Sequence, residues 1–197
     1  MKKIKNILAS KSPRREHILS QAGFKFSIVH SNVTEISEIE LPPEAFCEHW
    51  AREKAKKVAK KYPDHLIIGA DTVVVLDNQI LGKPKVPEKG EIMLNSLSGR
   101  THEVITGVSF IFNDEMDFTF NETTLVSINS LSSKEISDYI YTYKPYDKAG
   151  SYGIQDFFAV HINKIVGCYY NVMGLPISSF YKYYKNIKKK LTVNEKK

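Results

Sequence analysis

Strand-like and helix-like segments alternate along this chain of 197 residues, and no other feature narrows the choice of folds as much. Apolar runs bounded by turn residues predict strands at residues 4–9, 24–31, 65–76, 79–81, 101–112, 118–128 and 157–165. Helical patterns that begin at a proline or serine predict helices over residues 13–22, 43–61, 87–97 and 133–143, with a last helix after Pro176. Such alternation is typical of the α/β class.

The composition excludes several classes of protein. Apolar residues make up 42% and charged residues 25% of the chain, which is the balance of a globular domain with a sizeable core. The longest apolar runs fall far short of the ~20 residues that a membrane-spanning helix needs. Cys47 and Cys168 are the only cysteines, too few for a disulfide framework. We therefore expect a cytoplasmic protein with no membrane partner.

The net charge of +6 comes from 28 basic and 22 acidic residues, and residues 182–197 supply much of the excess. The run Lys188-Lys189-Lys190 fits either a nucleic-acid patch or the solvated end of a helix. The second use is the more common, so we do not expect nucleic acid as a partner. We predict one α/β domain over residues 1–185 and a basic tail over residues 186–197.

A candidate phosphate-binding segment lies at the first predicted strand-to-helix turn. It contains Ser10, Ser12, Arg14 and Arg15. A helix N-terminus offers backbone N–H groups and a partial positive charge, and arginine adds forked donors that suit phosphate oxygens. The alternative is an ordinary capped helix with surface arginines.

Asp71 is the first candidate for catalysis because it lies inside the apolar run of residues 67–75. A buried carboxylate is costly unless it is paired or bound to a cation. A divalent metal or an activated water is one partner for it, and backbone N–H groups are the alternative. Glu35 and Lys54 are candidates to join Asp71 in binding metal and neutralising phosphate charge, although each read alone is a surface charge.

Three turns carry further candidates. Gly82-Lys83-Pro84 is a rigid turn that projects Lys83 as a point charge for phosphate. His102 is a candidate acid, base or ligand, with a hydrogen-bonded structural histidine as the default. Residues 148–155 form a loop of small residues, in which the Gln155 amide can bind the edge of a base. The chain has no P-loop, no GxGxxG motif after a strand and no HExxH helix.

Taken together, these motifs resemble those of the Maf family of nucleotide pyrophosphatases from residue 7 to about residue 177. The segments that carry the resemblance are LASKSPRREHIL, IIGADTVVVLDNQILGKP, LSGRTHEVITGV, DKAGSYGIQ and YNVMGLP. The resemblance implies a mixed sheet in an α/β fold, related to inosine triphosphatases, with two lobes around a deep nucleotide-binding cleft. It also implies hydrolysis between the α- and β-phosphates of a nucleoside triphosphate with a divalent cation (Mg, Mn or Co).

The resemblance also implies roles for individual residues. The catalytic residues would be Asp71, Glu35, Lys54 and Lys83, of which Asp71 and Glu35 would bind the metal. The substrate-binding residues would be Ser10, Ser12, Arg14, Arg15, Thr72 and Gln155. Three of these, Arg14, Thr72 and Gln155, match the branch that acts on dTTP and UTP. Lys144 and Asp156 depart from the family pattern, and both border the base-reading loop.

A rival hypothesis from another functional class is a non-catalytic regulator of septum formation that binds nucleotide or nucleic acid. It predicts salt-sensitive binding of polynucleotides without turnover. Asp71 favours the enzyme, because a polyanion-binding protein gains nothing from a carboxylate inside its best motif. The sequence leaves open whether the chain forms a homodimer.

Overall fold

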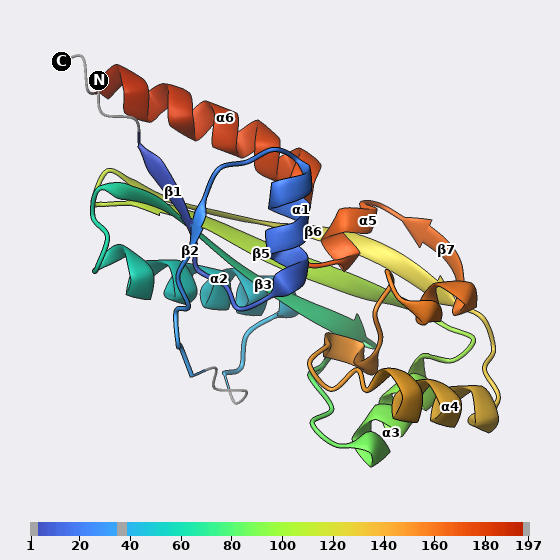
Figure 1. The fold of residues 1–197 in the computed structure, drawn as a ribbon. Coiled ribbons are helices and arrows are strands. Elements are labelled where there is room, and N and C mark those ends of the chain that lie inside the picture. Colours follow the sequence, from blue (N-terminus) through green and yellow to red (C-terminus); the bar gives the residue numbers. More distant parts are fainter. Residues whose placement is uncertain (1–3, 35–38, 195–197) are drawn as a thin grey trace. The chain divides into compact units, whose positions relative to one another are not determined.

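The computed structural model describes residues 4–34 and 39–194 and confirms the α/β class (Figure 1). Glu35, one of the predicted catalytic and metal-binding residues, lies outside the described residues. The strands are β1 (Lys5–Leu8), β2 (Ser27–Ile28), β3 (His65–Leu76), β4 (Gln79–Leu81), β5 (Thr101–Phe112), β6 (Met116–Ile128) and β7 (Ile162–Val166). The α-helices are α1 (Pro13–Gln21), α2 (Pro43–Ala59), α3 (Pro87–Leu97), α4 (Ser133–Tyr143), α5 (Tyr169–Val172) and α6 (Ile177–Asn194).

The strands form one seven-stranded mixed sheet, as predicted. Its order is β2-β1-β3-β5-β6-β7, and β4 pairs separately with β3. The β1 strand runs parallel to β2 and β3, whereas β3–β4 and β6–β7 are antiparallel. The register pairs Leu8 with Ile68, and the Ala9 N–H donates to the Ile68 carbonyl at 2.7 Å. The segment after β1 thus begins beside the part of β3 that leads to Asp71.

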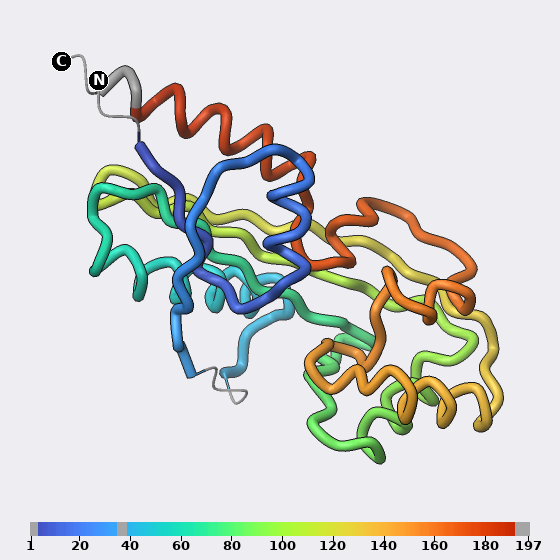
Figure 2. The backbone as a smooth tube through the Cα atoms, in the orientation of Figure 1, coloured from blue at the N-terminus to red at the C-terminus, as the bar shows by residue number. Residues whose placement is uncertain are grey.

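The chain divides into two compact units. The first contains residues up to Asp71, Thr106–Glu122 and the residues from Gly174 onward, and the second contains Thr72–Ile105 and Thr123–Met173. Three strands, β3, β5 and β6, pass from one unit into the other, and Figure 2 traces β5 and β6 as one long hairpin. The last helix, α6, ends at Asn194, so the predicted boundary at residue 185 falls inside a helix and stays a prediction.

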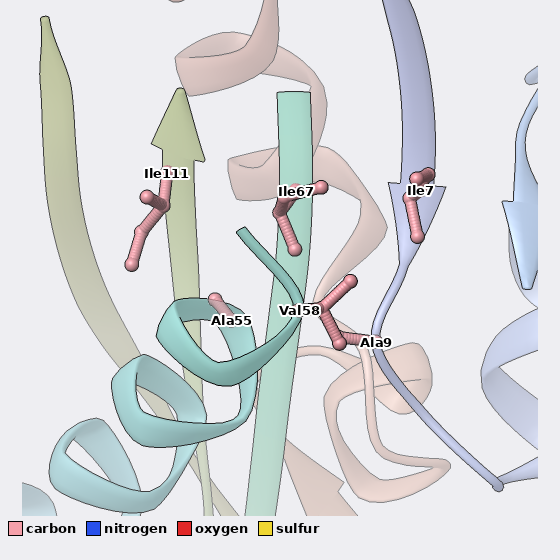
Figure 3. Packing of buried hydrophobic residues seen from close by; sticks show 6 residues of the cluster. All are labelled: Ile7, Ala9, Ala55, Val58, Ile67 and Ile111. Carbon is pink, nitrogen blue, oxygen red and sulfur yellow. The ribbon is translucent and has the colours of Figure 1, made fainter. Parts of the chain in front are cut away.

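On one face of the sheet in the first unit, α2 packs through small and branched side chains. Figure 3 shows Ala55 and Val58 of α2 against Ile7, Ile67 and Ile111, which come from three neighbouring strands. The helix lies very close to the sheet because β3 has no side chain at Gly69. A Cβ built at Gly69 would collide with the backbone carbonyl oxygen of Ala51.

We therefore predict that Gly69→Ala destabilises the fold by about 3 kcal/mol or more. The new methyl group meets backbone rather than the end of a flexible side chain, so α2 must move to accommodate it. The matched control is Gly82→Ala, since no heavy atom of the described residues lies within 4 Å of a Cβ at that position. Urea unfolding followed by circular dichroism measures both variants, and equal unfolding midpoints would contradict the prediction.

Helix α6 lies over the opposite face of the sheet in the first unit (Figure 1), and aromatic side chains pack between the helix and the strands. Phe180 of α6 lies 5.2 Å from Phe110 of β5, and Tyr183 lies 4.5 Å from Phe120 of β6, measured between ring centroids. Phe110 and Ile111 are consecutive in β5 and face opposite sides of the sheet. The alternation of a strand therefore places an aromatic layer under α6 and an aliphatic layer under α2.

In the second unit, α3 and α4 pack side by side (Figure 1). Helix α4 begins with a capping box, in which the Ser132 hydroxyl accepts from the Glu135 N–H and the Glu135 carboxylate accepts from the Ser132 N–H. A short 3₁₀ helix, η1 (Ala149–Ser151), lies in the small-residue loop. No helix among the described residues is long and apolar enough to cross a membrane.

Two predicted strands were wrong in extent. The first part of the predicted strand at residues 157–165 is instead a 3₁₀ helix, η2 (Phe157–His161), and β7 begins only at Ile162. The cause is Asp156, whose carboxylate accepts the Phe158 N–H at 3.0 Å and so starts a helical turn in an apolar segment. The predicted strand at residues 24–31 shrinks to two residues because only Ser27 and Ile28 pair with β1.

Candidate functional site

An ion pair of low exposure lies at the end of the first unit's portion of β3. Asp71 is 7% exposed and Lys54 of α2 is 9% exposed, and the Lys54 Nζ donates to Asp71 Oδ1 at 2.6 Å. The sequence predicts both residues for one site, and the structure brings them together. An ion pair shielded from water interacts far more strongly than an exposed one, so the charges of this pair are held at a defined place.

The thiol of Cys47 is near this pair but does not compete as a nucleophile. Burial raises its pKa above the ordinary value, and the negative charge of Asp71 raises that pKa further. Its Sγ lies 3.1 Å from the Glu44 carbonyl oxygen. The thiol therefore stays protonated and packs as a small apolar group.

The hydroxyl of Ser10 is oriented by two donors. Its Oγ accepts the backbone N–H of Ser12 at 3.1 Å and a guanidinium N–H of Arg15 at 3.2 Å. A hydroxyl has two acceptor lone pairs and one hydrogen. Because both lone pairs are in use, the Ser10 O–H is left to act as a donor, which is what a phosphate oxygen requires.

The two arginines of this segment differ in their surroundings. Arg15 is 8% exposed, and its Nε donates to the Gly174 carbonyl at 2.8 Å. Arg14 is half-buried. The backbone of Ser12 starts α1, but its side chain makes no capping hydrogen bond, so the expected serine cap is absent. Arg15 thus joins α1 to the start of the C-terminal helix, a contact between residues far apart in the sequence.

The second unit holds the remaining predicted residues. Lys83 and Gln155 are exposed, and Thr72, which follows Asp71 directly, is half-buried. The Gly150 N–H donates to the Gly82 carbonyl at 3.2 Å and so ties the lysine turn to the small-residue loop. Gly150 has φ +66°, and a Cβ there would lie 2.9 Å from the Val74 side chain, so the loop needs glycine at this point.

The surroundings of His102 agree with the default interpretation, a hydrogen-bonded structural histidine. The side chain is buried, and its Nε2 lies 2.7 Å from the Tyr152 hydroxyl. Burial lowers the pKa of His102 to about 4, so the ring is neutral at physiological pH. Among the described residues, Nδ1 has no hydrogen-bond partner. His102 therefore has the features of a structural residue that anchors Tyr152.

Of the two carboxylates predicted to bind a cation, the structure describes Asp71, and Glu35 lies outside the described residues. Among the residues that the structure describes, no group of three or more His, Cys, Asp and Glu side chains is arranged to hold a metal ion. Magnesium commonly binds through one or two carboxylates together with substrate phosphates and water. Asp71 fits that pattern, since it supplies one carboxylate at a fixed position.

Sequence reasoning missed two residues that organise these segments. Tyr139 was assigned no role, yet its hydroxyl contacts both Gly153 and Asp156 in the small-residue loop. Gly174 lies in the YNVMGLP motif, but nothing in that motif shows that its carbonyl accepts from Arg15. A tyrosine at apolar helical spacing is typical of a core residue, so the sequence contains no signal for the contact of Tyr139.

Comparisons with known proteins agree with these motifs. The family model described as Maf-like protein matches residues 5–187. The dTTP/UTP pyrophosphatase of Lachnoclostridium phytofermentans is 45% identical over 180 residues, which cover 89% of this chain and 91% of that protein. The dTTP/UTP pyrophosphatase of Agathobacter rectalis is 46% identical over 192 residues, and the match covers 89% of this chain and 93% of that protein. A solved structure of a nucleoside-triphosphatase / dITP/XTP pyrophosphatase from Mycobacterium abscessus shares 17% identity, covers 65% of this chain and 76% of that chain, and has a TM-score of 0.44.

Proposed function

Because the chain belongs to the Maf family, we propose that it hydrolyses nucleoside triphosphates to the monophosphate and pyrophosphate. The observation that carries this proposal is the pairing of Asp71, which lies in the motif of residues 67–84, with Lys54 at 2.6 Å. Relatives at 43–46% identity over about 90% of the chain are named dTTP/UTP pyrophosphatases. We propose that the reaction takes place in the cytoplasm on free nucleotide.

In the first unit, we assign phosphate binding to Ser10, Ser12, Arg14 and Arg15. The Ser10 O–H donates to a phosphate oxygen, since both of its lone pairs are already in use. The Lys54 ammonium offsets negative charge that builds on the pyrophosphate leaving group. Asp71 keeps that ammonium in place and is the acidic residue of the reaction.

A divalent cation, with Mg, Mn and Co as candidates, is the proposed cofactor. Asp71 and Glu35 are the residues that would hold it. When bound, such an ion polarises phosphate oxygens and lowers the pKa of water. In the second unit, Lys83 is the proposed additional point charge for phosphate, and its exposure leaves its ammonium accessible.

The test of the function is a product analysis with a panel of nucleoside triphosphates. We expect pyrophosphate and monophosphate in equal amounts, release that stops with EDTA, and recovery when Mg, Mn or Co is added in excess. Ion-exchange chromatography separates these products from the alternatives. Diphosphate with orthophosphate would contradict the cleavage position, and full activity in EDTA would contradict the cofactor.

For the base, we propose a preference for thymine and uracil through Gln155. Its side chain is exposed, and an amide offers one acceptor and two donor hydrogens, which suits the carbonyl and N–H edge that these two bases share. The bases differ by one methyl group, and discrimination by a methyl is worth only ~1–3 kcal/mol, so both should be substrates. Thr72 and Arg14 are the other proposed specificity residues.

We predict that kcat/KM is highest for dTTP and UTP, and that Gln155→Glu changes this ranking. The carboxylate keeps acceptors but loses the amide donors, so a carbonyl of the base loses its partner. Steady-state kinetics with dTTP, UTP, CTP, GTP and 7-methyl-GTP test both statements. A parent enzyme that favours 7-methyl-GTP, or a variant with an unchanged ranking, would show that Gln155 does not select the base.

A further inference from the structure

The exposed side chain of Gln155 projects from a segment whose neighbours are buried. Tyr152 is 5% exposed and Ile154 is 4% exposed, and Gly153 between them is buried as well. The Tyr152 hydroxyl is held by His102 Nε2 at 2.7 Å. The backbone on the N-terminal side of Gln155 is therefore anchored in the core of the second unit.

One hydroxyl connects the two sides of this segment. Tyr139 of α4 is 2% exposed, and its hydroxyl accepts the Gly153 N–H at 3.1 Å. The same hydroxyl donates to the Asp156 carboxylate, with distances of 3.1 and 3.2 Å to the two oxygens. Burial and the charge of Asp156 raise the pKa of Tyr139, so the hydroxyl keeps its donor hydrogen. Gln155 thus lies between two residues that share one partner.

The carboxylate of Asp156 is itself fixed by further contacts. Oδ1 accepts the Phe158 N–H at 3.0 Å, and the Asp156 N–H donates to the Gly153 carbonyl at 3.2 Å. A Cβ at Gly153 would collide with the carboxylate, so the glycine and the aspartate fit together. Lys148 Nζ, 4.0 Å from Oδ2, offsets part of the charge. Asp156 is one of the two departures from the family pattern, and here it has a defined structural partner.

Aromatic packing makes this arrangement stiff. The Phe158 ring lies 4.9 Å from the Tyr139 ring and 4.9 Å from the Tyr152 ring, measured between centroids. A side chain can read a base edge only if its backbone is held within a fraction of an ångström of the productive position. Hydrogen bonds supported by packed rings provide such a hold.

We propose that Tyr139 and Asp156 are positioning residues that set base selectivity by holding the backbone of Gln155. The proposal rests on the proposed function, in which Gln155 binds uracil or thymine. Neither residue needs to touch the substrate. Their effect therefore appears in the affinity for the correct base and in its preference over the wrong base, whereas the chemical step at the phosphates is spared.

The experiment compares Tyr139→Phe with Tyr143→Phe. Both remove one hydroxyl from α4, but Tyr143 is 41% exposed, so its variant is a matched control. For Tyr139→Phe we expect the KM for dTTP and UTP to rise about tenfold, because the Gly153 N–H and the carboxylate lose a partner. We expect kcat to change less than about twofold, and the preference over CTP to fall with the same factor as KM.

A second pair of variants separates geometry from charge. Asp156→Asn keeps an oxygen that accepts from Phe158 N–H and Tyr139, so it should retain most of the selectivity. Asp156→Ala removes that oxygen and should lose the selectivity as Tyr139→Phe does. Amide hydrogen exchange over residues 153–158, which needs no activity, should be faster in Tyr139→Phe and Asp156→Ala than in the parent and in Tyr143→Phe.

The outcomes distinguish a failure of the proposed function from a failure of the positioning role alone. A parent protein that releases no pyrophosphate from any nucleotide overturns the proposed function and this inference with it. An active parent whose Tyr139→Phe variant keeps its selectivity overturns the inference alone. A fall of kcat that is equal for dTTP, UTP and CTP, with KM unchanged, also overturns it, because that pattern indicates general damage to the fold.

Discussion

Replacing Asp71 by asparagine is expected to lower kcat/KM for triphosphate hydrolysis by about a hundredfold or more while the protein stays folded. The side chain keeps its shape, and its amide oxygen can still accept from Lys54 Nζ, which now lies 2.6 Å from Oδ1. What is lost is a negative charge at a site that is 7% exposed. A charge at such a site is worth far more than one in water.

The measurement is pyrophosphate release at saturating and at limiting dTTP, with circular dichroism to verify folding. Asp77→Asn is the control, because Asp77 is an exposed aspartate whose carboxylate pairs with Arg100 and which is not among the candidate site residues. We expect the control to keep parental activity. Near-normal turnover by a folded Asp71→Asn protein would remove Asp71 from the catalytic residues.

Replacing Lys54 by methionine is expected to reduce stability by about 3 kcal/mol and activity by about a hundredfold or more. Methionine replaces the aliphatic stem, but the Asp71 carboxylate loses its ammonium partner. The two side chains are 11% and 10% exposed, so water cannot fully replace that partner. We place the stability loss at the lower end of the range for broken buried pairs because of this residual exposure.

Urea unfolding of a set of variants isolates the ion pair from the loss of packing. The double variant Lys54→Met with Asp71→Asn has no unpaired charge and should be more stable than Lys54→Met alone. Lys134→Met removes an ion pair of the same length, 2.6 Å, whose side chains are 83% and 64% exposed, and it should leave the unfolding midpoint almost unchanged. A double variant that is less stable than Lys54→Met would refute the account.

The variants that test base selectivity lie in a different part of the molecule from the Asp71 and Lys54 variants. Asp71 and Lys54 belong to the first unit, and Gln155 with its Tyr139 contact belongs to the second. Loss of turnover with unchanged selectivity, and loss of selectivity with unchanged turnover, are therefore separable results. Obtaining each of them from its own variants would support the assignment of phosphate chemistry and base recognition to different residues.

The local sequence by itself determined where several helices start and where the tight turn between β3 and β4 lies. Pro13, Pro43 and Pro87 start helices because proline has the helical φ and lacks the N–H that a first turn leaves unpaired. Ser132 and Glu135 cap α4 reciprocally, as their spacing predicts. Asp77 and Asn78 adopt φ +51° and +62°, as a tight turn between β3 and β4 requires. In each case the residues that decide the structure lie within four positions of one another.

Asp71 could be named from the sequence because a charged group inside an apolar run is costly to bury unless it has a partner. Asp71 stands out in this way, and it indeed has a charged partner. Which residue would be that partner was not decided locally, since Lys54 lies 17 positions away on another element. The parallel pairing of β1 with β3 and the packing of α2 on the sheet bring the two together.

Only the tertiary structure decided which polar groups meet over long separations. Arg15 reaches the Gly174 carbonyl 159 positions away, and Tyr139 reaches Asp156, which directly precedes the segment of residues 157–165 that its own pattern predicts to be a strand. That segment becomes η2 because an Asp156 carboxylate that is held by Tyr139 also accepts the Phe158 N–H. Periodicity reports which face of an element is apolar, whereas a hydrogen bond between distant residues depends on how whole elements pack, and no local pattern contains that information.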